Sequence, residues 1–234
     1  MREIVLDTET TGFEPSEGHR IVEIGAIELF NHMPTGQTYH QYINPDRAMP
    51  KEAFEVHGLG DDFLRDKPRF ALIGQAFLDF IGADSRLVIH NAAFDMKFLN
   101  AELNWAGLPT IAMDRALDTV AVARRKFPGA PASLDALCRR FGIDNSAREK
   151  HGALLDSELL AEVYLELIGG RQPDFGLSQV AETRGTTQTS TQSGPWTAPR
   201  RPSPLPPRLT EAEAAAHAAF VEGMGDKAIW KRFG

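Results

Sequence analysis

Cysteine is nearly absent from this sequence, which has a single one, Cys138, in 234 residues. One cysteine excludes an internal disulfide framework and a zinc site built from clustered thiolates. Cys138 lies at helical spacing in LDALCRRF, with no catalytic motif around it. We therefore expect a packed core residue rather than a nucleophile.

Long hydrophobic runs are also missing. No stretch approaches the roughly 20 apolar residues that span a bilayer, and the opening MREIVLD lacks the apolar segment of a signal peptide. Hydrophobic residues make up 42% and charged residues 24% of the chain, which is typical of globular proteins. We expect a cytoplasmic protein with no membrane partner.

Positive charge is scarce in the larger part of the chain. The formal net charge is -7, and residues 1–170 hold 17 Lys/Arg against 26 Asp/Glu, whereas residues 171–234 hold eight against six. This balance argues against a protein that grips long duplex nucleic acid through a basic face. It is compatible with simple solubility, or with a carboxylate-rich site that needs divalent cations before it meets a phosphate.

Residues 1–170 alternate between strand-like and helix-like patterns. The predicted strands are EIVLDTE, Arg20–Phe30, Thr38–Pro45, Arg86–His90 and Arg115–Thr119, and the predicted helices are Phe70–Ile81, Ala92–Trp105, Ser133–Phe141 and Ala153–Ile168. Short loops between the first three strands favour antiparallel neighbours. The pattern predicts an α/β domain, a mixed five-stranded sheet flanked by helices.

The composition changes after Gly169-Gly170. Residues 183–208 are rich in Thr, Ser, Gln, Pro and Gly and bury too little apolar surface to offset the cost of ordering, so we predict a flexible linker. In residues 209–234, Thr210 and Glu213 form a capping box that starts a helix ending near Gly223. Such a helix is too short to be stable alone. Its apolar residues, among them Phe220 and Trp230, predict that this tail binds a partner.

Two carboxylates stand at the end of the first predicted strand. In LDTETTGF, Asp7 and Glu9 lie two residues apart, so they share one face of the strand with Cα atoms about 7 Å apart. Like charges on one face repel each other, and a strand interior disfavours Asp. The neighbouring sequence offers no Lys or Arg, and carboxylate oxygens suit Mg²⁺ or Mn²⁺.

Two further acidic motifs open predicted helices. Asp95 in HNAAFD falls in a first turn, and HGALLDSELL places Asp156 in the second turn of its predicted helix with His151 in the loop before it. Taken singly, each acid is an ordinary helix N-terminal residue. His90 and His151 have equally ordinary interpretations, as a strand-end and an exposed loop histidine, and the helical spacing of Phe94 with Phe98 predicts a core position for it.

Taken together and in this order, DTETTG, HNAAFD and HGALLD resemble the three exonuclease motifs of the DEDD superfamily, in its histidine-bearing branch. Within that branch the chain is similar to the epsilon family of proofreading subunits of bacterial DNA polymerase III. The similarity extends to EAFEVHGL, at 52–59, and to the tail segment EAAAHAAFVE. It implies a ribonuclease-H-like fold for residues 1–170 and a metal-dependent 3′→5′ exodeoxyribonuclease that proofreads for a replicative polymerase.

The resemblance also implies a role for each matching residue. Asp7, Glu9, Asp95 and Asp156 would hold two divalent ions, Mg²⁺ or Mn²⁺, and His151 would be the general base toward the attacking water. The product would be a nucleoside 5′-monophosphate. The residues implied to contact the 3′-terminal nucleotide are Asp7, Glu9, Thr10, Glu52, His57 and Asp156, although Glu52 and His57 have the alternative of a pair on a helix surface.

The implied partners are DNA with a single-stranded 3′ end, the polymerase alpha subunit at the tail, a sliding clamp and a small theta-like subunit. The segment RQPDFGL, within residues 171–182, resembles clamp-binding peptides, with Gln172, Phe175 and Leu177 as anchors. A fraying helix end is the alternative interpretation of that segment.

Two other functions remain open on the residues alone. One is a 3′→5′ exoribonuclease of the same superfamily, although those proteins generally lack a linker and a partner-binding tail. The other is a replisome scaffold subunit with an inert centre, which five intact metal and base positions disfavour.

Overall fold

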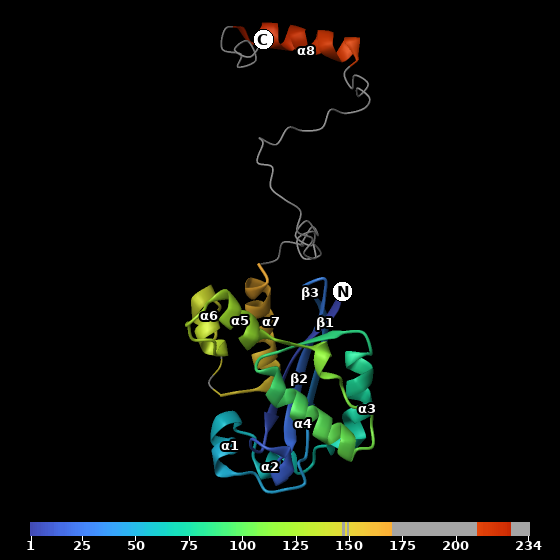
Figure 1. The fold of residues 1–234 in the computed structure, drawn as a ribbon, viewed down its shortest axis with the longest axis vertical. Helices are drawn as coiled ribbons and strands as arrows, with labels where there is room; N and C mark the ends of the chain where they lie inside the picture. Colours follow the sequence, from blue (N-terminus) through green and yellow to red (C-terminus); the bar gives the residue numbers. More distant parts are fainter. Residues whose placement is uncertain (147, 149, 170–209, 226–234) are drawn as a thin grey trace, which may run out of the picture. The chain divides into compact units, whose positions relative to one another are not determined.

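The computed structural model describes residues 1–146, 148, 150–169 and 210–225 (Figure 1). The chain divides between Val180 and Ala181 into two compact units, and each is described by itself. The predicted clamp-binding segment with Gln172, Phe175 and Leu177, the predicted linker 183–208, and Trp230 lie outside the described residues.

The first unit is built on one five-stranded sheet. Its strands are β1 (Arg2–Thr10), β2 (Ile21–Phe30), β3 (Met33–Tyr42), β4 (Arg86–Ile89) and β5 (Ala116–Asp118), in the order β3-β2-β1-β4-β5. β1, β2 and β3 pair antiparallel, whereas β4 runs parallel to β1 and β5 parallel to β4. This confirms the predicted mixed sheet and places β1 at its centre.

Helices cover both faces of the sheet (Figure 1). They are α1 (Lys51–His57), α2 (Asp61–Leu64), α3 (Phe70–Ile81), α4 (Ala92–Trp105), α5 (Thr119–Lys126), α6 (Leu134–Phe141) and α7 (Ala153–Leu167), with 3₁₀ turns at Pro15–Glu17 and Met113–Arg115. One core joins the sheet to α3 and α4, and the other joins it to α5, α6 and α7. Among the described residues, no helix has the length and apolar content that crossing a membrane requires.

Alternation along β1 decides which side chain enters which core. Ile4 and Leu6 lie in the core with α3 and α4, while Val5 lies in the core with α6 and α7, as the two-residue period of a strand requires. Cys138 on α6 is fully buried in that second core, which confirms its predicted packing role.

The structure differs from the predicted elements in two places. The third strand spans Met33–Tyr42 instead of Thr38–Pro45, and it begins earlier because Asn31 and His32, with φ of 50° and 64°, make a two-residue hairpin turn. The helices α1, α2 and α5 were not predicted from periodicity. α5 has only eight residues and three cations in its last turn, too few apolar positions to show a helical stripe.

The second unit contains α8 (Glu211–Gly223), which confirms the predicted helix. Thr210 Oγ1 accepts a hydrogen bond from Glu213 N at 3.3 Å, and Thr210 N donates to Glu213 Oε2 at 2.9 Å. The predicted capping box is therefore formed. Phe220 on this helix is 65% exposed, and its role in binding a partner stays a prediction.

Candidate active site

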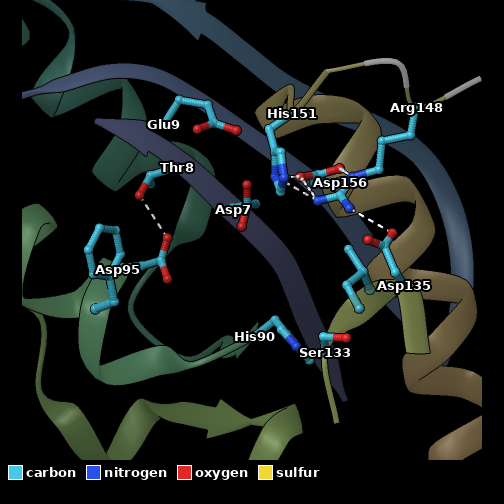
Figure 2. A pocket seen from close by; sticks show the side chains of 12 residues that line it. Asp7, Thr8, Glu9, His90, Asp95, Ser133, Asp135, Arg148, His151 and Asp156 are labelled. Carbon is cyan, nitrogen blue, oxygen red and sulfur yellow. Dashed lines mark hydrogen bonds and ion pairs between the residues drawn. The ribbon is translucent and has the colours of Figure 1, made fainter. Parts of the chain in front are cut away.

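The pocket at the C-terminal end of β1 contains the five residues predicted to carry the chemistry. It has a volume of about 290 Å³, and Asp7, Glu9, Asp95, His151 and Asp156 all line it. They come from β1, α4 and α7 with its preceding loop, and they surround one space (Figure 2). Three distant sequence segments therefore meet at one position.

The alternation of β1 continues into this pocket. Asp7 and Glu9 follow Val5 on the side of the sheet that α7 covers. Thr8, between them, turns to the α4 side, where its hydroxyl donates to Asp95 Oδ1 at 2.7 Å. Asp95 is buried, and this bond fixes its carboxylate beside the strand end.

A close approach between α7 and β2 holds the third segment in place. A Cβ on Gly25 would lie 2.2 Å from the backbone C of Ala153 and N of Leu154, so only glycine permits this contact. Ser157 Oγ donates to the carbonyl oxygen of Gly25 at 2.9 Å, and Ala153 N donates to Glu23 Oε2 at 3.2 Å. These contacts place Asp156 against the end of β1, in the first turn of α7, which begins at Ala153, and not in the second turn as predicted.

Burial and mutual repulsion act on three of the carboxylates. Burial raises the pKa of Asp7 well above its ordinary value, and the charges of Asp95, Glu9 and Asp156 raise it further. Burial, followed by the charge of Asp156, raises the pKa of Glu9 to about 8. Burial raises the pKa of Asp95 to about 7. Buried carboxylates with raised pKa values are stabilised by binding a proton or by a nearby cation.

The donor set fits a divalent cation. Glu9, His151 and Asp156 each offer one ligand atom, and these atoms lie within 4.8 Å of one another. Carboxylate oxygens in such a cluster suit hard cations such as Mg²⁺ and Mn²⁺, and a cation would relieve the repulsion that raises the pKa of Asp7 and Glu9.

Arg148 is a site residue that the sequence analysis missed. Its Nε and Nη2 donate to the two carboxylate oxygens of Asp156 at 2.5 and 2.7 Å, and its Nη1 donates to Asp135 Oδ1 at 2.8 Å. Burial acts to raise the pKa of Asp156, but hydrogen bonds from His151 and Arg148 outweigh it, and the pKa is lowered. Arg148 lies in the loop before the third motif, and no spacing rule singles it out.

His151 sits at the mouth of the pocket with its side chain about half exposed. Its Nδ1 lies 3.2 Å from Asp156 Oδ2 and 2.7 Å from Arg148 Nη2. If Nδ1 of the neutral imidazole carries the proton and donates it to Asp156, Nε2 keeps a free lone pair. If Nδ1 instead accepts a hydrogen bond from Arg148, the lone pair of Nδ1 is used and the proton lies on Nε2.

A second hollow of about 430 Å³ adjoins the first, with Thr8, Glu9 and Phe94 lining both. Its other lining residues include three that were predicted to contact a terminal nucleotide, Thr10, Glu52 and His57. The structure thus places these three beside the carboxylate pocket.

His57 is buried, and Leu59 N donates to its Nδ1 at 3.0 Å, so Glu52 and His57 are not a pair on a helix surface. Burial lowers the pKa of His57, which keeps the imidazole neutral at neutral pH. Phe94 contacts Phe98 at 5.1 Å between ring centroids but also faces both hollows. The prediction of a purely core position for Phe94 was therefore incomplete.

Comparison with known proteins identifies the family. The exonuclease family model RNase_T matches residues 4–164. The chain is 56% identical to DNA polymerase III subunit epsilon of Rickettsia felis, over 75% of this chain and 77% of that protein. It is 45% identical to DNA polymerase III subunit epsilon of Escherichia coli, over 98% and 97%.

A solved structure supports the fold alone. The nuclease domain of 3′hExo, a DEDDh family member bound to rAMP, has a TM-score of 0.61 at 20% identity, covering 71% of this chain and 91% of that one. The exonuclease family is divalent-metal dependent, in keeping with the carboxylate pocket. The chain belongs to this exonuclease family and, within it, to the DNA polymerase III epsilon subunits, which are proofreading 3′→5′ exonucleases.

Proposed function

We propose that this chain removes mismatched 3′-terminal nucleotides, which reach it as a single-stranded 3′ end of DNA, as nucleoside 5′-monophosphates, within a DNA polymerase III complex in the cytoplasm. The observation that carries this proposal is the convergence of four carboxylates and one imidazole, from three distant segments, on one pocket. The membership of the chain in the DNA polymerase III epsilon family supports a role within that polymerase complex.

Asp7, Glu9, Asp95 and Asp156 would hold two ions, Mg²⁺ or Mn²⁺, with Asp95 acting directly or through water. When bound, such a pair supplies stabilisation of the entering and leaving oxygens of an in-line displacement. The raised pKa values of Asp7 and Glu9 support this assignment, since a cation is the counter-charge that these side chains lack.

His151 would take the proton of the attacking water. This role requires the tautomer in which Nδ1 donates to Asp156 Oδ2, 3.2 Å away, so that Nε2 carries the lone pair. Arg148 competes for Nδ1 from 2.7 Å, and the proton transfer therefore requires Arg148 to leave that nitrogen.

The second hollow would receive the 3′-terminal nucleoside. Thr10, Glu52, His57 and Phe94 all line it, so a sugar and base entering it would meet both polar groups and an aromatic ring. Asp7, Glu9 and Asp156 would contact the same nucleotide at its phosphate end.

The test is release of mononucleotides from labelled single strands by the full chain, with and without Mn²⁺. Asp7→Ala should lower the rate on the order of 10³-fold or more, while Asp66→Ala, at an exposed carboxylate that lines neither hollow, should leave it unchanged. Activity of Asp7→Ala near the parent level would refute the metal assignment. Faster turnover of matched RNA 3′ ends would favour the exoribonuclease alternative.

For partners, we propose that residues 209–234, including Phe220 and Trp230, bind the polymerase alpha subunit, and that Gln172, Phe175 and Leu177 bind a sliding clamp. A small theta-like subunit would complete the assembly. The exposed side chain of Phe220 on α8 supports the first contact. Deleting residues 205–234 should spare hydrolysis of free strands and abolish co-purification with the polymerase, and persistent association would contradict this role.

A further inference from the structure

A third hollow extends the active site on the side away from the terminal-nucleoside hollow. Its volume is about 360 Å³, and it shares His90 and Ser133 with the carboxylate pocket. It shares no residue with the hollow of Thr10 and His57. In Figure 2, His90 and Ser133 lie on the opposite side of Asp7 from Glu9. The three hollows therefore follow one another, with the carboxylates in the middle.

This order fixes a direction for the strand, on the basis of the proposed function. If the 3′-terminal nucleoside occupies the hollow of Thr10 and His57 and its phosphate meets the carboxylates, the preceding nucleotides must leave past the carboxylates. The third hollow is the continuation on that side. Each preceding nucleotide carries one negatively charged phosphodiester.

Arg124 is the cation that lines the third hollow. It is exposed on α5, and its guanidinium forms no ion pair or hydrogen bond with any residue that the structure describes. The two cations that follow it differ. Lys126 Nζ donates to the carbonyl oxygens of Glu166 and Leu167 at 3.1 and 2.8 Å, closing the end of α7, and Arg125 does not line the hollow.

The acidic residue in the hollow is already engaged with the backbone. Asp118 Oδ1 accepts hydrogen bonds from Val120 N at 2.9 Å and Asn91 N at 3.1 Å, at the starts of α5 and α4. A carboxylate at two helix N-termini has its charge partly balanced there. The guanidinium of Arg124 is thus left to meet an anion from outside the protein.

We propose that Arg124 and the hollow it lines form a binding site for the DNA backbone, in which the guanidinium contacts a phosphodiester on the 5′ side of the bond that is cut. Arg124 holds the strand and does not contact the reacting atoms. A contact of this kind is independent of base sequence and weakens as salt rises.

The experiment compares a substrate that reaches this hollow with one that ends before it. The first is a single-stranded decanucleotide, and the second is the p-nitrophenyl ester of thymidine 5′-monophosphate, which has no preceding nucleotide. Arg124→Gln should raise KM for the decanucleotide about fivefold at unchanged kcat and reduce the salt slope by about one. Its kinetics on the ester should equal those of the parent chain. Arg125→Gln, one residue away on the same helix, is the matched control and should match the parent chain on both substrates.

Two results would overturn the site: an unchanged KM of Arg124→Gln for the decanucleotide, or an equal loss on the ester, which would indicate a structural effect. Equilibrium binding of a fluorescent decanucleotide to Asp7→Ala, with and without Arg124→Gln, tests the same contact without hydrolysis. If the parent chain hydrolyses neither substrate, the proposed function fails, and the binding measurement still decides the role of Arg124.

Discussion

The carboxylates on β1 and α4 and the carboxylate on α7 line one pocket, but their protonation equilibria shift in opposite directions. Burial raises the pKa of Asp7, Glu9 and Asp95, and none of these side chains has a cation bonded to it among the described residues. The pKa of Asp156 is lowered despite burial, because Arg148 and His151 hydrogen-bond to it.

Among the described residues, a cation therefore bonds directly to one half of the cluster, and its charge is the weakest of the influences on the pKa of Asp7 and Glu9. The α7 half carries its own, Arg148, which bonds both oxygens of Asp156. The half on β1 and α4 depends on protons or on an added cation to offset its repulsion. Metal binding should therefore stabilise the β1 half most and should compete with Arg148 at the α7 half.

The largest effect is expected where the two halves are joined. Gly25→Ala would place a methyl group 2.2 Å from the backbone of Ala153 and Leu154, so α7 must move away from β2 and carry Asp156 with it. We expect the free energy of unfolding to fall by about 3 kcal/mol and hydrolysis to fall at least about 100-fold. Urea denaturation and mononucleotide release measure the two effects.

The matched control for Gly25→Ala is Gly152→Ala, at the start of the same helix, where a Cβ meets no atom within 4 Å. It should be nearly neutral for stability. Equal destabilisation by the two variants would show that the close approach of α7 to β2 is not what holds the halves together.

Removing Arg148, the internal counter-charge, should make the carboxylate pKa values of the two halves of the cluster alike. Arg148→Gln leaves Asp156 without its bidentate partner, so its pKa should rise toward those of Glu9 and Asp95. We expect a loss of about 2 kcal/mol in chelator at neutral pH, less than for a fully enclosed ion pair because the pocket is open to water. Urea denaturation in EDTA tests this, and a variant as stable as the parent chain would contradict the role assigned to Arg148.

Removing a negative charge from the half on β1 and α4 should stabilise the metal-free protein, whereas removing Arg148 should destabilise it. Asp7→Asn relieves repulsion with Glu9 and Asp95, so in EDTA it should stabilise the chain by about 1 kcal/mol. Chelation should lower the melting temperature of the parent chain and have less effect on Asp7→Asn. An unchanged melt of the parent chain on chelation would indicate that no divalent ion stabilises the pocket.

The smallest effect is a pH dependence confined to metal-free protein. The folded-state pKa values of Glu9, about 8, and Asp95, about 7, exceed their unfolded values of 4.5 and 3.8. The folded state then binds more protons, so stability should be greatest below about pH 4 for these groups and should fall as pH rises toward 8. Asp156, with a lowered pKa, should lose stability only as pH falls below its ordinary value.

Unfolding measurements at pH 5 and pH 8 in EDTA, repeated with Mn²⁺, would test this trend. Added metal should flatten it, and Asp7→Asn should reduce it. A rise in stability from pH 5 to pH 8 in EDTA would contradict the raised pKa values of Glu9 and Asp95, because Asp156, with its lowered pKa, titrates below this range.

The sequence by itself determined most of the elements of the sheet and its main helices, although not α1, α2 and α5. Helices predicted at Phe70–Ile81 and Ala92–Trp105 match α3 and α4 residue for residue, and the capping box at Thr210 is formed. Asp7 and Glu9 stand out as a like-charged pair on one strand face, whereas Asp95, Asp156 and His151 were found because their motifs together resemble those of a known exonuclease family. Apolar periodicity, capping and short motifs are properties of neighbouring residues, so they are legible without the fold.

Only the tertiary structure decided which charges and hollows meet. The pairing of Arg148 with Asp156, the inward position of His57 and the exposed place of Arg124 beside the pocket depend on how distant elements pack. Gly25 shows the reason most directly, because the absence of a side chain there lets its backbone approach that of Ala153, which is far away in sequence. Such contacts leave no period or motif in the sequence, because a side chain's partner across the sheet is set by the register and docking of whole elements.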